Sequence, residues 1–186
     1  HRDLHYRLLF FSLRFSLDLY LGFSELPINV EFMHRKSFEA ELKSMQPKYF
    51  MCITNPDINK VIDDEFKKKE LHEVRSCISS ISSKAFDKGK KKLTVEDDYD
   101  ELLGLKNLFH AFKFPLYAKW YYISEEHKQD NIKGLNIINA MIHHLYDEST
   151  GTLQERCDKV LEIIKPMHNE TMTNFRLNFP KEINTK

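Results

Sequence analysis

The chain has 186 residues, of which 41% are hydrophobic and 30% are charged, and 28 basic residues balance 28 acidic ones. This length can bury a core as one domain, or as one domain with a helical addition. The zero net charge argues against a dedicated nucleic-acid-binding domain, which usually carries a basic surplus, and the five glycines argue against glycine-rich nucleotide cradles.

The N-terminal part shows the pattern of strands. From Leu9 to Leu21 every odd position is apolar, and strict alternation places these side chains on one side of a strand, although leucine also favours helices. Residues 22–27 have turn chemistry, and residues 28–32 alternate again. These features predict a β-hairpin.

A short helix and a further strand are expected next. Ser37 is placed to cap a helix that runs to Met45, and Pro47 lies just beyond its end. Residues 49–54 are a brief apolar run rich in strand formers, which predicts another strand.

After residue 55 the apolar residues recur at helical spacing. Four apolar stripes predict helices, and they span residues 71–85, 99–112, 132–145 and 153–164. A small sheet followed by a stack of helices predicts an α+β fold, in which the helices cover an N-terminal β-sheet.

Helix ends are predicted from caps and prolines. Thr-x-x-Asp at 94–97 and Thr-x-x-Glu at 152–155 match capping boxes. Pro115 and Pro166 are expected to break helices, and the tail from residue 167 to 186 is expected to be less regular.

Cysteine and hydropathy patterns predict a compartment. Cys52, Cys77 and Cys157 lie far apart without a Cys-x-x-Cys pair, which is typical of reduced thiols in a cytoplasmic or nuclear protein. Arg14 and Asp18 interrupt the most apolar stretch, which therefore falls short of the roughly 18 residues of a membrane span. We expect no membrane partner.

We find no catalytic, cofactor-binding or metal-binding motif. The sequence has no Walker loop, no Gly-x-Gly-x-x-Gly, no Gly-x-Ser-x-Gly and no His-Glu-x-x-His. Zinc needs three or four convergent ligands, but His72 and Cys77 are five residues apart on a predicted helix and fall on different faces. We therefore expect a protein without enzymatic activity, cofactor or metal.

Basic and aromatic clusters have two interpretations each. The lysine runs at 67–69 and 88–92 are followed by acidic residues, which favours solvated loops over an acidic partner or nucleic acid. Trp120 and Tyr121 could form an exposed aromatic anchor, although a buried helix face is the favoured interpretation.

Several segments resemble the BTB/POZ family. Residues 32–38, Phe-Met-His-Arg-Lys-Ser-Phe, resemble the signature that follows the second strand of that domain, and residues 17–21 resemble its first core strand. Residues 46–50 resemble its Ser-Pro-Tyr-Phe stretch, residues 59–62 resemble the following strand, and residues 93–122 resemble its terminal helix pair.

The resemblance implies domains, an interface and a charged pair. It implies a BTB/POZ-like domain over residues 7–125 and a helical extension over residues 129–180. In that family the first strand and helix build a two-fold dimer interface, and a charged pair near the dimer groove matches Asp18 with Arg35. The corresponding dimer candidates are Phe10, Phe11, Leu13, Phe15 and Leu17, which could instead pack inside their own chain.

The favoured function is a non-enzymatic protein-interaction and dimerisation module that acts as a scaffold or adaptor, as a homodimer or with a different protein. One alternative is a substrate adaptor of a ubiquitin ligase that docks on a cullin scaffold, but residues 54–58 lack the apolar-x-Glu motif that this docking uses in the family. Another is an RNA- or DNA-associated domain that uses the lysine-rich segments. The residues expected on a partner surface are Asn55, Asp57, Ile58, Trp120 and Tyr121.

Overall fold

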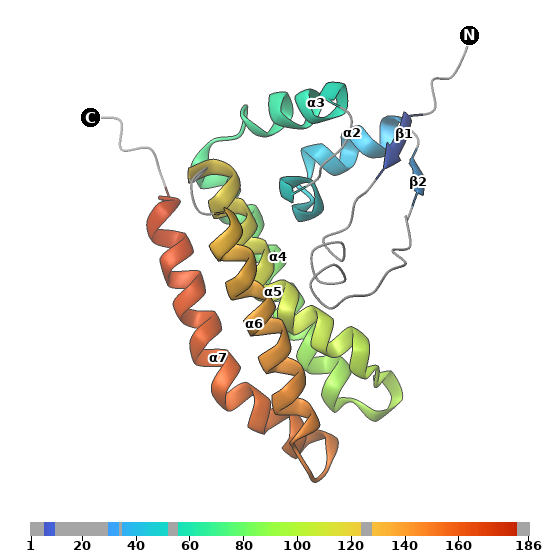
Figure 1. Cartoon of the computed structure of the whole chain (residues 1–186), viewed down its shortest axis with the longest axis vertical. Coiled ribbons are helices and arrows are strands. Elements are labelled where there is room, and N and C mark those ends of the chain that lie inside the picture. The colour runs from blue at the N-terminus through green and yellow to red at the C-terminus, as the bar shows by residue number, and fades with distance from the viewer. Residues whose placement is uncertain (1–5, 10–29, 34, 52–55, 124–127, 182–186) are drawn as a thin grey trace. The chain divides into compact units, whose positions relative to one another are not determined.

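The structure of the chain is a computed structural model, shown in Figure 1. It describes residues 6–9, 30–33, 35–51, 56–123 and 128–181. The chain divides into two compact units, residues 1–70 and residues 71–186.

The first unit contains two short strands followed by short helices. Strand β1 (Tyr6–Leu9) pairs antiparallel with β2 (Val30–Met33), with Tyr6 opposite Met33 and Leu9 opposite Val30. The helical elements are α2 (Arg35–Lys43), the 3-10 helix η1 (Pro47–Met51) and α3 (Pro56–Phe66).

Aromatic contacts hold these short helices together. The rings of Phe38 and Tyr49 lie edge to face with centroids 5.6 Å apart, and those of Phe50 and Phe66 are 5.0 Å apart. The Tyr49 hydroxyl donates to the Glu41 carboxylate at 2.6 Å. These contacts join α2 and α3 through η1.

The second unit is a helical bundle. Its described helices are α4 (Leu71–Thr94), α5 (Glu101–Ile123), α6 (Lys128–Asp147) and α7 (Leu153–Asn178), with a 3-10 turn η2 (Glu96–Asp98) between the first two. Helices α4 and α5 pack along each other, and α7 packs against α4, α5 and α6. The central core consists of Leu93, Leu105, Leu108, Phe112, Ile142, Tyr146, Cys157, Val160, Leu161 and Ile164.

The predicted α+β fold is wrong. From residue 35 onward the described residues form helices and contain no strand, and the described strands are limited to the short β1–β2 pair. The predicted strand at residues 49–54 begins as η1, and residues 59–62 lie in α3. The physical reason is spacing, because Ile62 and Phe66 are four residues apart and both are buried on one helix face. Most of the alternating segment, residues 10–29, lies outside the described residues.

The domain limits stay a prediction. We expected a division between residues 125 and 129, whereas the two compact units divide after residue 70. Helices α6 and α7, which correspond to the expected extension, pack against α5 within the second unit.

Both prolines expected to break helices lie inside them. Helix α5 continues through Pro115, and α7 continues through Pro166 and the expected irregular tail as far as Asn178. A proline in a helix cannot donate to the carbonyl four residues earlier. For Pro115 that carbonyl belongs to Ala111, and it accepts a hydrogen bond of 2.7 Å from the hydroxyl of Ser82 on α4. The tertiary structure therefore satisfies the group that this proline leaves free.

The two predicted capping boxes have different outcomes. The box at Thr152 is confirmed, because its hydroxyl accepts from the Glu155 amide at 3.3 Å and its amide donates to the Glu155 carboxylate at 2.8 Å. The box at Thr94 is wrong, because Thr94 is the last residue of α4 and its hydroxyl donates back to the Lys90 carbonyl. The carboxylate of Asp100 instead accepts from an amide in the first turn of α5.

We expect Thr152→Ala to lower the free energy of unfolding by about 1 kcal/mol, since it removes the side-chain acceptor that caps α7. Urea denaturation would measure the loss. Thr173→Ala is the matched control, because the Thr173 hydroxyl lies within α7 and donates only to the Asn169 carbonyl. An equal loss in both variants would contradict a capping role.

Candidate functional site: a basic pocket on helices α4 and α7

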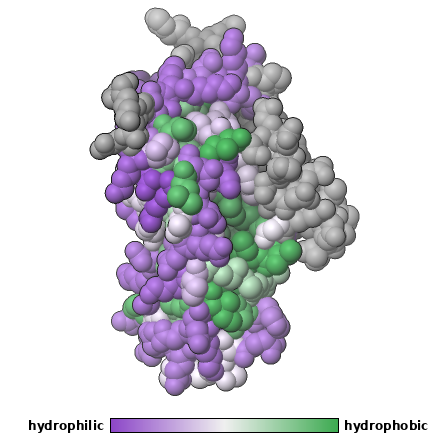
Figure 2. Space-filling view, turned by 90° about the vertical axis from the view of Figure 1, so that its left-hand side faces the viewer, coloured by the Kyte–Doolittle hydropathy of each residue, from purple (hydrophilic) through white to green (hydrophobic). Residues whose placement is uncertain are grey.

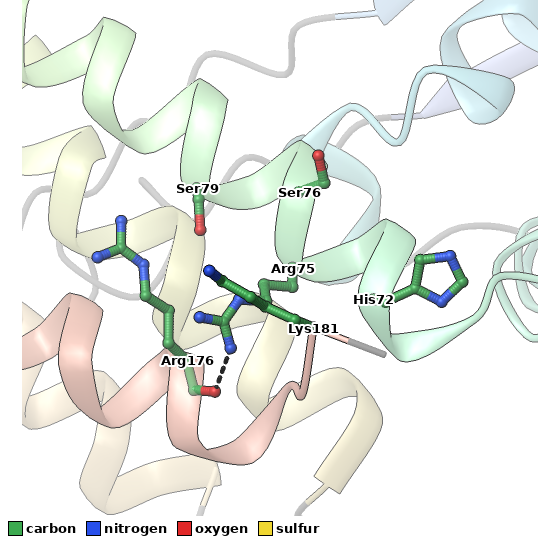
Figure 3. Close-up of a pocket in the computed structure, with 6 residues that line it drawn as sticks. All are labelled: His72, Arg75, Ser76, Ser79, Arg176 and Lys181. Atoms are coloured by element: carbon green, nitrogen blue, oxygen red, sulfur yellow. Dashed lines mark hydrogen bonds between the residues drawn. The ribbon is translucent and has the colours of Figure 1, made fainter. Parts of the chain in front are cut away.

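A pocket lies beside the first half of α4 and the end of α7, within the second unit. Its volume is about 580 Å³, and the residues that line it are His72, Arg75, Ser76, Ser79, Arg176 and Lys181. The first four follow one another at spacings of three, one and three residues, so they share one face of α4. Figure 3 shows these side chains around the end of α7.

Arg75 positions the end of α7. Its Nη1 atom donates to the carbonyl oxygens of Arg176 and Phe179, each at 2.7 Å. Carbonyls at a helix C-terminus lack partners within the helix and carry partial negative charge, so a guanidinium there is favourable. These bonds connect α4 to a segment about a hundred residues later and bring Arg176 and Lys181 to the pocket.

Ser79 presents a hydroxyl without a partner. Its Oγ is buried and makes no hydrogen bond to any described residue. Figure 3 shows this hydroxyl on the side of the pocket where the side chains of Arg176 and Lys181 also end. A buried hydroxyl without a hydrogen bond costs about 1–3 kcal/mol, so an acceptor brought by a ligand would recover this free energy.

The pocket is electropositive. Arg75, Arg176 and Lys181 are cationic at neutral pH, and none of the six described residues that line the pocket is acidic. Concave sites lined by one sign of charge concentrate the field and attract counter-ions. The arrangement is suited to holding an anionic group, and His72, Ser76 and Ser79 add polar groups around it.

The predicted dimer residues cannot be placed. Those outside the described residues are Phe10, Phe11, Leu13, Phe15 and Leu17, together with Asp18 of the charged pair and Asn55 of the partner surface. Arg35 is the first residue of α2. The structure therefore neither brings together nor separates the dimer interface and the Asp18–Arg35 pair.

The other predicted partner-surface residues lie on two helices. Asp57 is exposed in the first turn of α3, and Ile58 follows it in the same helix. Trp120 in α5 is only 3% exposed, with its ring 5.4 Å from that of Tyr117, and Tyr121 is half-buried. This agrees with the favoured interpretation, a buried helix face at Trp120, and not with an exposed aromatic anchor there.

The lysine runs have acidic neighbours. Lys91 lies 3.3 Å from the Asp98 carboxylate, and Lys92 contacts the same group, which holds the pKa of Asp98 below its usual value. Lys68 pairs with Glu65 at 3.4 Å. Residues 88–92 lie within α4, so the expectation of a loop there is wrong.

Neither a metal site nor a membrane span is found in the part of the chain that the structure describes. No three histidine, cysteine or acidic residues converge there on a point where a metal ion could bind. No described helix has the length and apolarity needed to cross a membrane.

The visible surface is mostly hydrophilic, with separate hydrophobic areas, as Figure 2 shows. In the second unit the most exposed large apolar side chains are Leu102, Ile137 and Leu177, and they lie on three different helices.

The sequence indicated only part of this pocket. The polar spacing of His72, Arg75, Ser76 and Ser79 could have suggested a solvent-facing stripe on a predicted helix. The contribution of Arg176 and Lys181 could not be anticipated, because we expected the chain to be irregular after residue 166. No family model, curated protein or solved structure matches this chain.

Proposed function

We propose that this chain is a non-enzymatic protein-interaction module, acting as a scaffold or adaptor, whose basic pocket receives an acidic group of a partner protein. The observation that supports this proposal is the convergence of Arg75, Arg176 and Lys181 in one concave site. Five of the six described lining residues lie on α4 and α7, which pack against each other, and Lys181 follows the end of α7.

The form of the pocket favours one acidic group over a nucleic-acid backbone. Nucleic-acid surfaces usually present a basic patch or stripe that follows successive phosphates. Here the convergent cations line one pocket, and the chain has no net charge. Lys91 and Lys92, which belong to a lysine-rich segment, are paired with the carboxylate of Asp98.

Compartment and self-association are also proposals. Neither Cys77 nor Cys157 is in a disulfide, which supports a reducing compartment, the cytoplasm or the nucleus. Homodimerisation and docking on a cullin scaffold stay predictions, and the basic pocket requires neither of them.

The proposal predicts that pocket charge controls binding. Fluorescence polarisation with degenerate peptide libraries, in which a fixed central residue is serine, glutamate or phosphoserine, would measure it on the whole chain. We expect the wild type to bind at least one acidic library. The double variant Arg176→Glu with Lys181→Glu should bind at least about tenfold more weakly, equivalent to about 1.4 kcal/mol.

A charge-matched variant controls for long-range electrostatics. Lys84 and Lys165 are exposed on α4 and α7, outside the residues that line the pocket. Lys84→Glu with Lys165→Glu changes the net charge equally, and its affinity should stay within about twofold of the wild type. Failure of the wild type to bind any acidic library, or equal weakening in both double variants, would overturn the proposal.

A further inference from the structure

We propose that the acidic group held by this pocket is a phosphate monoester on a serine or threonine of the partner, so that partner binding depends on phosphorylation. This inference rests on the proposed function and specifies its ligand. Its support is the number of cations available in the pocket, the hydrogen-bond donors that line it and the size of the cavity.

The available charge matches a dianion. A carboxylate carries one negative charge, whereas a phosphorylated serine carries about −1.5 to −2 at pH 7. Arg75 is directed toward the terminal carbonyls of α7, so part of its charge is already compensated. Arg176 and Lys181 form no side-chain ion pair with a described residue, which leaves two cations for the ligand.

The donors come from two segments that lie far apart in the sequence. Figure 3 shows Ser79 on α4 and the side chains of Arg176 and Lys181 coming from the end of α7 and the residues after it. A phosphate presents three terminal oxygens in a tetrahedral arrangement, so each of these donors could engage a different oxygen. A planar carboxylate has only two oxygens, so at least two of these three donors would have to share one oxygen.

The size of the cavity favours a phosphate attached to a larger group. Its volume of about 580 Å³ lies within the range of ligand pockets, about 300–1,000 Å³. A free phosphate ion would leave most of this space to water, whereas a phosphorylated side chain with its neighbouring backbone would occupy more of it. None of the described lining residues is Phe, Tyr or Trp, and the planar side chains of the lining are those of His72, Arg75 and Arg176.

The test compares the fixed serine, glutamate and phosphoserine libraries at equal concentrations of the whole chain. We expect the phosphoserine library to bind at least about tenfold more tightly than the glutamate library, and the serine library to bind least. Ser79→Ala should weaken phosphoserine binding severalfold and change glutamate binding much less. Circular dichroism would verify that each variant is folded.

The outcomes separate this inference from the function on which it rests. Equal binding of phosphoserine and glutamate libraries, lost in the Arg176→Glu with Lys181→Glu variant, would overturn the phosphate preference and leave the interaction module in place. No binding of any acidic library would overturn both.

Competition experiments distinguish a phosphorylated protein from a small phosphate. Inorganic phosphate and free phosphoserine should displace the phosphopeptide library only at concentrations at least about a hundredfold higher than an unlabelled phosphopeptide does. If either competes as well as the peptide, the ligand is a small phosphate and the proposed phosphoprotein partner is wrong.

Discussion

Gly89→Ala is expected to destabilise the second unit by about 2–3 kcal/mol, at the upper end of what overpacking a core costs. A Cβ atom at Gly89 would lie 2.8 Å from the Leu108 amide nitrogen and 2.9 Å from the Gly104 carbonyl oxygen. Both atoms belong to the backbone of α5, so a side-chain rotation cannot relieve the contact. Helices α4 and α5 would have to separate, which would loosen the buried side chains of Leu93 and Leu108 between them.

Two further glycine substitutions make this prediction specific. At Gly104 the added Cβ would lie 2.6 Å from the Leu93 Cγ, a side-chain atom, so we expect a smaller loss than at Gly89. At Gly134 in α6 it would meet nothing within 4 Å, so Gly134→Ala should stabilise the chain by up to about 1 kcal/mol through helix propensity. Urea denaturation at pH 7 would rank the three variants. A loss at Gly89 below about 0.5 kcal/mol would show that the helix pair tolerates separation.

The helices of the second unit could be predicted because their apolar spacing agrees with their packing. The stripe from residue 71 to 85 lies in α4, and its members Val74, Ile78 and Ala85 are buried. Thr152 was correctly predicted as a cap because both groups of the capping box are close in sequence. Local patterns of this kind require no knowledge of distant residues.

The errors arose where a distant contact or a short segment decides the structure. Pro115 was expected to end a helix, but the hydroxyl of Ser82, on another helix, satisfies the carbonyl that it leaves free. The segments 49–54 and 59–62 are so short that the spacing of their apolar residues does not distinguish a strand from a turn of helix. The aromatic pairing of Phe50 with Phe66 joins the resulting helices, and no local rule contains it.

The pocket illustrates the same limit. Four of its residues follow a helical spacing that can be read from the sequence, but Arg176 and Lys181 reach it because α7 continues past Pro166. Helix α7 continues because His168, Met172 and Phe175 are buried on one face at spacings of four and three residues. The charge of the site therefore depends on a packing interaction that local motifs did not reveal.

A buried polar network joins three helices of this unit. The Ser82 hydroxyl on α4 lies 2.7 Å from the Ala111 carbonyl on α5, 3.0 Å from Nε2 of His168 on α7, and 3.3 Å from the sulfur of Met172. A hydroxyl has one hydrogen to donate, and the Ala111 carbonyl can only accept. Nε2 of His168 must therefore carry a hydrogen and donate to Ser82, which fixes the neutral tautomer of the imidazole.

The environment of His168 opposes a positive charge. Its ring stacks on that of Phe86, with centroids 4.7 Å apart, and meets the edge of Phe112. The pKa of His168 is lowered to about 4, mainly by burial and to a smaller extent by the positive charge of Arg176. The negative charge of Asp87 acts in the opposite direction. The folded state thus holds His168 neutral in a range of pH where the unfolded chain binds a proton.

We expect the free energy of unfolding to fall by about 2 kcal/mol between pH 7 and pH 5 through His168 alone. Because the folded pKa is below the unfolded value of 6.5, this stability is present at neutral pH and is lost as the pH falls from about 6.5 to about 4. His110 acts in the same direction, since burial and the charges of Lys113 and Lys106 lower its pKa to about 4. The pKa values of Asp98 and Glu155 are lowered, so the stability that these carboxylates contribute is lost only at more acidic pH. These two residues therefore contribute little to the change between pH 7 and pH 5.

His168→Gln isolates this contribution. The amide of glutamine can donate to Ser82 as Nε2 does, but it does not titrate. The variant should be less stable at pH 7, because it loses the ring contacts with Phe86 and Phe112. Its loss of stability between pH 7 and pH 5 should nevertheless be smaller than that of the wild type by about 2 kcal/mol, measured by urea denaturation at both pH values. If the variant keeps the full pH dependence of the wild type, the proton taken up on unfolding belongs to another group, and His168 is exposed enough to be charged in the folded chain.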